Sequence, residues 1–80
     1  MAIRTYQGIT PSLGARVFID SSAVVIGDVQ LGEDSSVWPF ALIRGDMHRI
    51  RIGARSSVQD GGVLQITHAG PFNPGGFPLI

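Results

Sequence analysis

The sequence predicts an all-β fold, a parallel β-helix built from hexapeptide repeats. The main observation is a period of six. Starting at Leu13, every sixth residue is aliphatic, in the run Leu13, Ile19, Val25, Leu31, Val37 and Ile43. An α-helix of about 3.6 residues per turn cannot keep positions six apart on one face, whereas short strands joined by tight corners can. We therefore expect these residues to fill the interior of a stacked repeat structure.

The repeat changes phase once, which fixes the expected stacking. After three extra residues within DMHRIRIG it resumes at Ile52, Val58 and Leu64. Three hexapeptides make one coil, so about three coils are expected, over 13–30, 31–48 and 52–69. Across the insertion the offset between stacked residues grows by three, which places Leu64 over Ile43 and Gln65 over Arg44. The fourth position after each aliphatic residue is small or modest in size, as at Val17, Ala23, Val29, Ser35, Ala41, Ser56 and Gly62.

Glycines mark the expected corners between strands. They fall at Gly14, Gly27, Gly32 and Gly53, where a backbone with positive φ would be tolerated. The coils are expected over 13–69, after a lead-in at 1–12, and residues 70–80 read as a loop rich in Gly and Pro that begins a further coil. The alternative fold is a small antiparallel sandwich with coincidental spacing.

Size, charge and composition limit the function classes. A chain of 80 residues buries a small fraction of its surface, and the absence of cysteine excludes disulfides and thiolate zinc clusters, so oligomerisation is expected. The six arginines balance six acidic residues, which argues against a nucleic acid partner. Because no segment approaches about 18 consecutive apolar residues, we expect no membrane span and a cytoplasmic location.

Three strings carry a resemblance to a known family. They are IRGD at 43–46, IGARSSVQDG at 52–61 and the loop NPGGFPL at 73–79. Together they resemble the γ-class carbonic anhydrases, which are left-handed β-helices, and the resemblance runs from about Ile19 to the end of the chain. It implies a homotrimer that hydrates CO2 reversibly to bicarbonate, with zinc at each subunit interface bound by three histidines from two chains.

The resemblance also implies roles for particular residues. Arg44 and Asp46 match a pair associated with the subunit interface. Gln59 and Asp60 match the polar pair near the metal-bound water. The first histidine ligand of the family falls six residues after that glutamine, and here this position is Gln65.

The resemblance leaves the metal site incomplete in this chain. The other two ligands come from a coil after the loop, so the chain resembles the N-terminal portion of a longer protein. Catalytic zinc takes three protein ligands, often imidazoles, and lowers the pKa of bound water to about 7. An amide oxygen at Gln65 is a weaker donor. His68 matches no ligand but is a fallback if the loop shifts, and we expect no CO2 hydration from these 80 residues alone.

Several alternatives stay open from the residues themselves. Gln59 and Asp60 are also explained by a tight corner, and Arg44 and Asp46 by a structural ion pair. Trp38 follows an inward residue and faces outward, as an interface anchor or a surface residue, and His48 in the insertion is expected to be exposed. Two other function classes remain: a non-catalytic trimeric scaffold or binding module, which Gln65 favours, and a hexapeptide acyltransferase.

Overall fold

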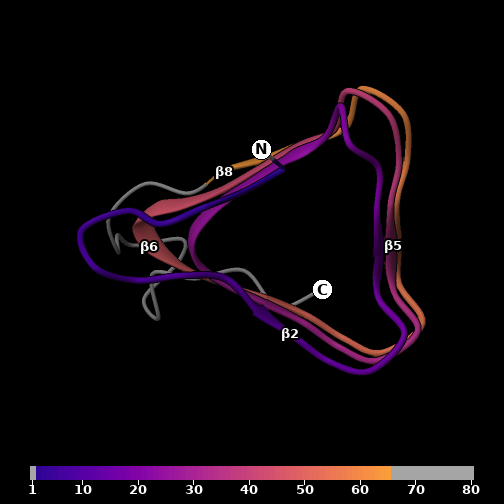
Figure 1. Cartoon of the computed structure of the whole chain (residues 1–80), viewed down its shortest axis with the longest axis horizontal. Helices are drawn as coiled ribbons and strands as arrows, with labels where there is room; N and C mark the ends of the chain where they lie inside the picture. The colour runs from indigo at the N-terminus through magenta and orange to yellow at the C-terminus, as the bar shows by residue number, and fades with distance from the viewer. Residues whose placement is uncertain (1, 66–80) are drawn as a thin grey trace, which may run out of the picture.

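The chain winds into a triangular prism of parallel strands (Figure 1). The structure is a computed structural model that describes residues 2–65. Among these residues the regular elements are all strands: β1 (Ile3–Arg4), β2 (Ser12–Leu13), β3 (Phe18–Ile19), β4 (Val24–Leu31), β5 (Ser36–Val37), β6 (Leu42–Ile52), β7 (Ser57–Val58) and β8 (Val63–Gln65). None of the described residues forms a helix able to cross a lipid bilayer.

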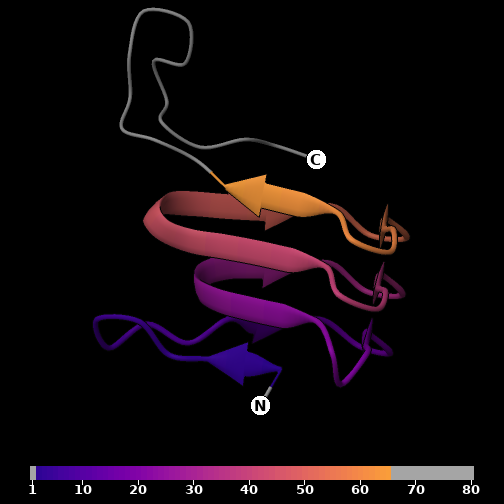
Figure 2. The same ribbon diagram turned by 90° about the horizontal axis from the view of Figure 1, so that it is seen from above.

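Strands distant in sequence stack into two parallel sheets. One has the order β1-β4-β6-β8 with β2 also paired to β4, and the other has the order β3-β5-β7. In Figure 1 the chain passes counterclockwise from the β2 edge to the β5 edge, and Figure 2 shows that it recedes from that viewpoint as it does so. A counterclockwise path that recedes is left-handed. The predicted left-handed parallel β-helix is therefore confirmed.

The register confirms the phase change predicted from the repeat. Strands β4 and β6 pair Val25 with Ile43 and Gly27 with Gly45, but the next pair is Val29 with Ile50. One residue of β4 thus faces four residues of β6, so three extra residues bulge outward at one corner. Beyond the bulge the stacking resumes. On its other edge, opposite β4, strand β6 pairs with β8 in the predicted register.

The interior is filled by the repeat residues, as predicted. Val25, Val37 and Ile43 have no exposed surface. Within residues 2–65 the core consists of Ala23, Val25, Val29, Leu31, Val37, Ala41, Ile43, Ile50, Ile52 and Val58. Leu13 differs, since it is 40% exposed, because among the described residues β2 pairs only with β4 and nothing stacks on its other side. Leu64 is half-buried against the core.

Gly27 uses the positive φ that glycine tolerates at these corners, whereas Gly14 and Gly32 do not. Gly27 has φ 78°. At the other two glycines the reason is close packing between layers. A Cβ on Gly14 would lie 2.7 Å from the backbone nitrogen of Glu33, and one on Gly32 would lie 2.5 Å from that of Ala54. Real Cβ atoms do not approach backbone so closely, so these glycines let neighbouring corners stack.

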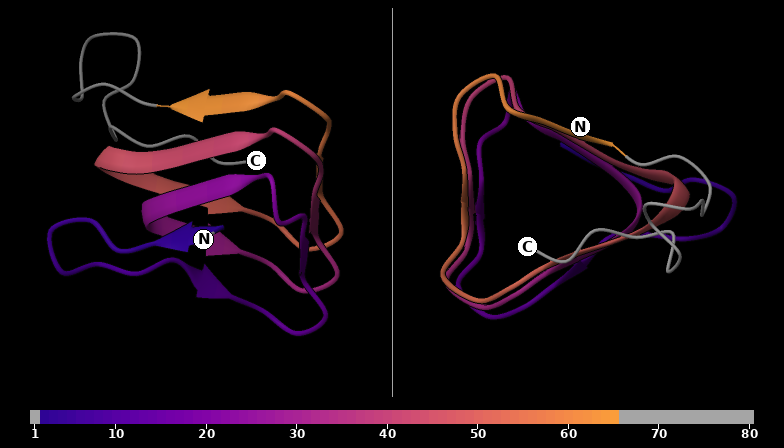
Figure 3. Two further views of the ribbon diagram at one scale, coloured as in Figure 1. Left: turned by 45° about the horizontal axis from the view of Figure 1, so that its top comes forward. Right: turned by 180° about the vertical axis from the view of Figure 1, so that it is seen from behind.

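The left-handed backbone conformation at one corner is adopted by charged residues instead. Arg16, Asp34 and Arg55 have φ of 56°, 58° and 58°. They recur at the stacking offset, so the same corner repeats through the layers, as the superimposed outlines in Figure 3 show. The geometry of the coil therefore sets the conformation here, since arginine seldom adopts it, although aspartate tolerates it better.

Candidate functional site

Arg44 and Gln65 lie next to each other on the outer face of the β4-β6-β8 sheet. They are register partners in β6 and β8, and Ile26 of β4 lies on the other side of Arg44. Gln65 is exposed and Arg44 is half-buried. The inward neighbours, Ile43 and Leu64, anchor both strands. The predicted stacking of Gln65 over Arg44 is thus confirmed, and the two side chains leave the same face.

Asp46 forms an ion pair with Arg44 within the chain. The Arg44 guanidinium donates through Nη2 at 3.0 Å and through Nε at 3.3 Å to Asp46 Oδ2. The side chains are 40% and 18% exposed, respectively. Two positions apart along a strand, they project to the same side, as the sequence predicted. This ion pair holds the Arg44 guanidinium on the strand next to Gln65.

The bulge beside this ion pair carries His48. It is half-buried, so the expectation of an exposed side chain is wrong. Its Nδ1 accepts a hydrogen bond from the backbone N–H of Arg49 at 3.0 Å. The Arg49 side chain reaches back to Asp28 on β4, at 3.6 Å between Nε and Oδ2. A small pocket of about 200 Å³ opens between the bulge and residues 6–9.

Gln59 and Asp60 lie on the corner that precedes β8. The backbone N–H of Gly62 donates to the Gln59 carbonyl at 2.9 Å, and Gly61 between them has φ 70°. These features define a tight turn with glycine where φ must be positive. Both polar side chains are exposed. The turn accounts for the Asp-Gly sequence and leaves both side chains on the surface, one corner away from Gln65.

A cluster of polar side chains on the β5-β7 face holds Gln59, and sequence reasoning missed it. The Trp38 indole N–H donates to Ser36 Oγ at 2.9 Å and to Ser57 Oγ at 3.1 Å. The Gln59 side-chain nitrogen lies 2.6 Å from the same Ser57 oxygen. The stacking offset was the available signal, since it places Ser57 over Ser36. We call Ser36, Trp38, Ser57 and Gln59 the serine cluster.

A charged ladder occupies the left-handed corner, away from the Arg44 face. Arg16 donates to Asp34 through Nε at 2.6 Å and through Nη2 at 3.0 Å. This hydrogen bonding, with a smaller contribution from the charge of Arg55, lowers the pKa of the Asp34 carboxyl below its ordinary value of 3.8. The ladder neutralises charge at this corner, and none of the predicted site residues belongs to it.

Comparisons with known proteins agree with the repeat and with the γ-class resemblance. The family described as bacterial transferase hexapeptide (six repeats) matches residues 10–45. Protein YrdA of Escherichia coli (strain K12) is 51% identical over 77 residues, which is 96% of this chain and 42% of that protein. A carbonic anhydrase of Geobacillus kaustophilus (strain HTA426) is 40% identical over 72 residues, which is 90% of this chain and 38% of that protein.

A solved structure agrees with the fold. The hexapeptide transferase family protein from Anaplasma phagocytophilum matches with a TM-score of 0.75 and 35% identity, over 78% of this chain and 37% of that one. These comparisons support a γ-carbonic anhydrase-like family of hexapeptide-repeat proteins for this chain. The chain spans less than half the length of these three proteins.

The described residues of this γ-carbonic anhydrase-like chain do not fit a complete zinc site. Zinc in proteins takes imidazole nitrogen, thiolate sulfur or carboxylate oxygen. Within residues 2–65 no three His, Cys, Asp or Glu side chains gather to hold a metal. The position implied for the first ligand offers the neutral amide of Gln65. His68, the fallback ligand, lies outside the described residues.

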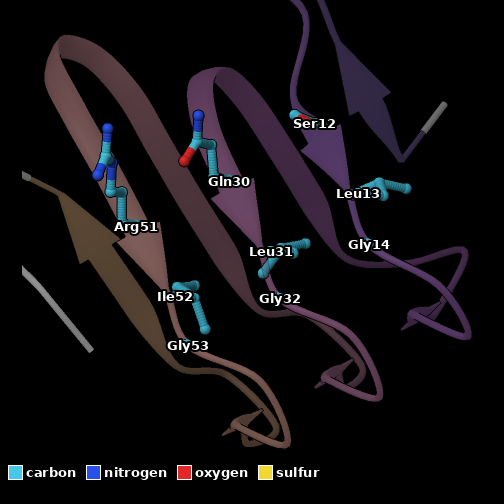
Figure 4. A pocket seen from close by; sticks show the side chains of 9 residues that line it. All are labelled: Ser12, Leu13, Gly14, Gln30, Leu31, Gly32, Arg51, Ile52 and Gly53. Atoms are coloured by element: carbon cyan, nitrogen blue, oxygen red, sulfur yellow. The ribbon is translucent and has the colours of Figure 1, made fainter.

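The third face of the prism carries a groove. It has a volume of about 560 Å³ and runs across β2, β4 and β6. Figure 4 shows Ser12, Gln30 and Arg51 one per strand, beside Gly14, Gly32 and Gly53. Polar side chains thus follow one side of the groove, while the glycine column leaves backbone accessible. No histidine belongs to its lining among the described residues.

Proposed function

We propose that this chain forms a subunit of a γ-carbonic anhydrase-like homotrimer that takes part in the reversible hydration of CO2 in the cytoplasm. The observation that carries the proposal is the register of Arg44 with Gln65, combined with the ion pair from Arg44 to Asp46. In this proposal Arg44 and Asp46 are the interface pair and Gln65 is the first ligand position, and the three residues lie on one outer face. The carbonic anhydrase among the relatives supports the reaction class.

Each predicted site residue has a role in this proposal. Arg44 and Asp46 lie at the interface with the neighbouring subunit, where the half-buried guanidinium and carboxylate offset each other. Gln59 and Asp60, exposed on the preceding corner, orient the oxygen that adds to CO2 and the bicarbonate that leaves. Zinc is the cofactor proposed for longer members of the family. Residues 2–65 do not complete a site for this metal.

A chimera tests the proposal directly. Residues 1–80 would replace the matching stretch of the Geobacillus kaustophilus carbonic anhydrase, with Gln65 retained in one version and changed by Gln65→His in the other. We expect both chimeras to form trimers and only the histidine version to hydrate CO2 in stopped-flow assays with zinc. If both form trimers and neither hydrates CO2, this chain does not supply the orienting residues and the proposal fails.

A non-catalytic trimeric scaffold is the second candidate function. The observation that favours it is the exposed amide of Gln65 at the ligand position. If the chain is a scaffold, we expect a trimer that retains no metal after purification in zinc. We also expect no gain of CO2 hydration activity in the chimera that carries Gln65→His. Gain of activity in that chimera excludes it, because the rest of the site would then be intact.

A hexapeptide acyltransferase is the third candidate, and the groove of about 560 Å³ is the observation that favours it. The matched hexapeptide family also has transferase in its description. Such an enzyme needs a general base near the acceptor, and His48 lies on the bulge, outside the groove lining. Calorimetric titration with acetyl-CoA distinguishes this candidate, since only an acyltransferase is expected to bind it.

A further inference from the structure

The first layer of the interior is uncovered at one end of the prism, which we call the open end and which is formed by β1, β2 and β3. Each side of the triangle contributes one inward residue to this layer, stacked on a core residue: Ile3 on Val25, Leu13 on Leu31 and Ile19 on Val37. Those core residues are at most 3% exposed, whereas Leu13 is 40% exposed. A further layer on the open end would therefore remove apolar surface from water.

The segment between β1 and β2 does not cover the open end. It forms a turn in which Tyr6 and Ile9 exchange backbone hydrogen bonds of 2.9 and 3.0 Å. Figure 1 shows this indigo segment projecting outward from a corner of the triangle, and Figure 2 shows it beside the prism. The described residues thus leave the end of the interior uncovered.

Backbone groups at the open end define what can cover it. The N–H groups of Gly14, Phe18 and Asp20 donate to carbonyls of the next layer at 2.8, 3.0 and 2.9 Å. Because N–H groups alternate between the two edges of a strand, those of Leu13 and Ile19 point to the open end, where no described strand pairs with them. Charged residues or proline often protect such edges, but β2 and β3 contain neither. The matching partner is another strand edge.

The charges at the open end select one arrangement of a second copy. Arg4 of β1 is exposed, Asp20 follows β3, and β2 carries no charge. A two-fold axis through the middle of the β2 side pairs β2 with its own copy and β1 with β3 of the partner, in antiparallel directions. Arg4 then lies diagonally across from Asp20 of the partner subunit, within reach of a long side chain. An axis through either other side would oppose Arg4 to Arg4 or Asp20 to Asp20.

We propose that the open end is an interface between two copies of this chain, related by a two-fold axis through the β2 side, in which the layers of Ile3, Leu13 and Ile19 cover each other. One surface serves both partners, so the contact closes at two copies and does not extend into a fibre. Each edge strand has only two residues, so the contact depends on three edges and the apolar layer together. It uses no residue of the outer face that carries Arg44 and is independent of CO2 hydration.

Disulfide cross-linking tests the arrangement, because the chain contains no cysteine. Leu13→Cys places a thiol opposite its own copy, at the separation of about 4.5–5.5 Å between Cα atoms that opposed antiparallel residues have and a disulfide accepts. Oxidation of this variant of the 80-residue chain with copper phenanthroline is expected to give a covalent dimer. Val63→Cys, 58% exposed on β8, is the matched control and should give little dimer. Cross-linking of the two variants only when they are mixed would show head-to-tail association and overturn the proposal.

Charge exchange tests the pairing of β1 with β3. Arg4→Asp and Asp20→Arg should each weaken association by about tenfold in sedimentation equilibrium, because the two-fold axis repeats each lost pair. The double variant should recover most of the association. Arg51→Asp, an equal change of charge at an exposed position on a side face, is the control. Single variants that associate normally, or a folded double variant without recovery, would overturn the axis.

Hydrogen exchange tests the open end without any substitution. Protection of the Leu13 and Ile19 amides should rise with protein concentration, because these groups gain acceptors only in the dimer. The amides of Gly14 and Phe18 already donate within the chain and serve as internal controls. Protection of Leu13 and Ile19 that does not change with concentration would overturn the proposal, because a covering segment of the same chain would give that result.

Discussion

Arg44 and Gln65 are paired across adjacent parallel strands, one layer apart on the same outer face. The γ-carbonic anhydrase-like resemblance gives the first residue to a subunit interface and the second to a metal. Their pairing makes these two roles neighbours in space. The charge of Arg44 is partly offset by Asp46, so the Gln65 position borders a half-buried ion pair.

The weakness of Gln65 as a ligand leads to the first prediction. The 80-residue chain should bind zinc weakly and show no CO2 hydration, and Gln65→His should tighten zinc binding by about tenfold, or ~1.4 kcal/mol, because imidazole is the better donor. Gln30→His is the control, since Gln30 is exposed on another face. Calorimetric zinc titration measures both. If His68→Ala abolishes zinc binding while Gln65→His changes nothing, the assignment of the ligand position is wrong.

The second prediction concerns the interface assigned to Arg44. Arg44→Ala should change the stability of the subunit by only about 0.5 kcal/mol, because the guanidinium is 40% exposed and solvent screens the pair. It should weaken self-association measurably, because it removes the charge that offsets Asp46 on the proposed interface. Sedimentation equilibrium measures the change, with Arg16→Ala at the far corner as the control. Equal association of both variants would reject the interface assignment.

The third prediction tests the interior of the prism. Ile43 has no exposed surface. Ile43→Asp should destabilise the fold by more than about 4 kcal/mol, because it buries a charge without a partner. Ile43→Val should cost about 1 kcal/mol for one lost methylene. Urea denaturation followed by circular dichroism separates the two variants. A folded aspartate variant with native stability would show that this position does not face the interior.

The fourth prediction separates the two uses of glycine. Gly32→Ala should destabilise the fold by about 2 kcal/mol, because the new Cβ would meet the Ala54 backbone nitrogen at 2.5 Å. Gly8→Ala meets nothing within 4 Å and loses only the freedom that φ 80° requires, so about 1 kcal/mol is expected. Thermal denaturation compares them. A larger loss at Gly8 than at Gly32 would contradict the role of close layer packing.

The fifth prediction follows from the carboxyl of Asp34. Arg16 lowers its pKa in the folded state below the ordinary 3.8. The folded state therefore binds this proton less readily than the unfolded state, so the ladder contributes stability above pH 3.8 that is lost as the pH falls through the lowered pKa. Asp34→Asn should flatten the dependence of unfolding free energy on pH as the pH falls below about 4. Ser21→Ala, an exposed and uncharged turn position, is the control and should leave that dependence in place.

The sequence predicted the stacking because the aliphatic period and the length of the insertion can both be counted directly along the chain. Ile43 under Leu64 and Arg44 under Gln65 followed from counting alone. Counting did not identify Ile50 as buried, because it lies inside the insertion where the period is interrupted. It also overestimated the burial of Leu13, since burial depends on a further layer as well as on the direction of the side chain.

The candidate site was less accessible to sequence reasoning. Residue types and a family resemblance placed Gln59 and Asp60 at a polar corner, and the structure shows the turn that exposes them. The hydrogen bonds from Trp38 to Ser57 depend on side-chain rotamers across two strands, and the repeat fixes only which residues are neighbours. The ion pair of Arg44 and Asp46 was foreseeable because two positions along a strand share one side. Its half-buried setting depends on the bulge.

The corner shared by Arg16, Asp34 and Arg55 has a consequence for how sequences on this scaffold can vary. The position of each residue within its coil sets its backbone conformation, and its φ lies within a few degrees of the φ of the equivalent residues in the adjacent layers. The substitutions tolerated at a site should therefore depend on its position within the coil and not on the residue type found there. Asparagine or glycine should be accepted at every equivalent corner, and valine or isoleucine at none, so that one scan at Asp34 would forecast the other layers.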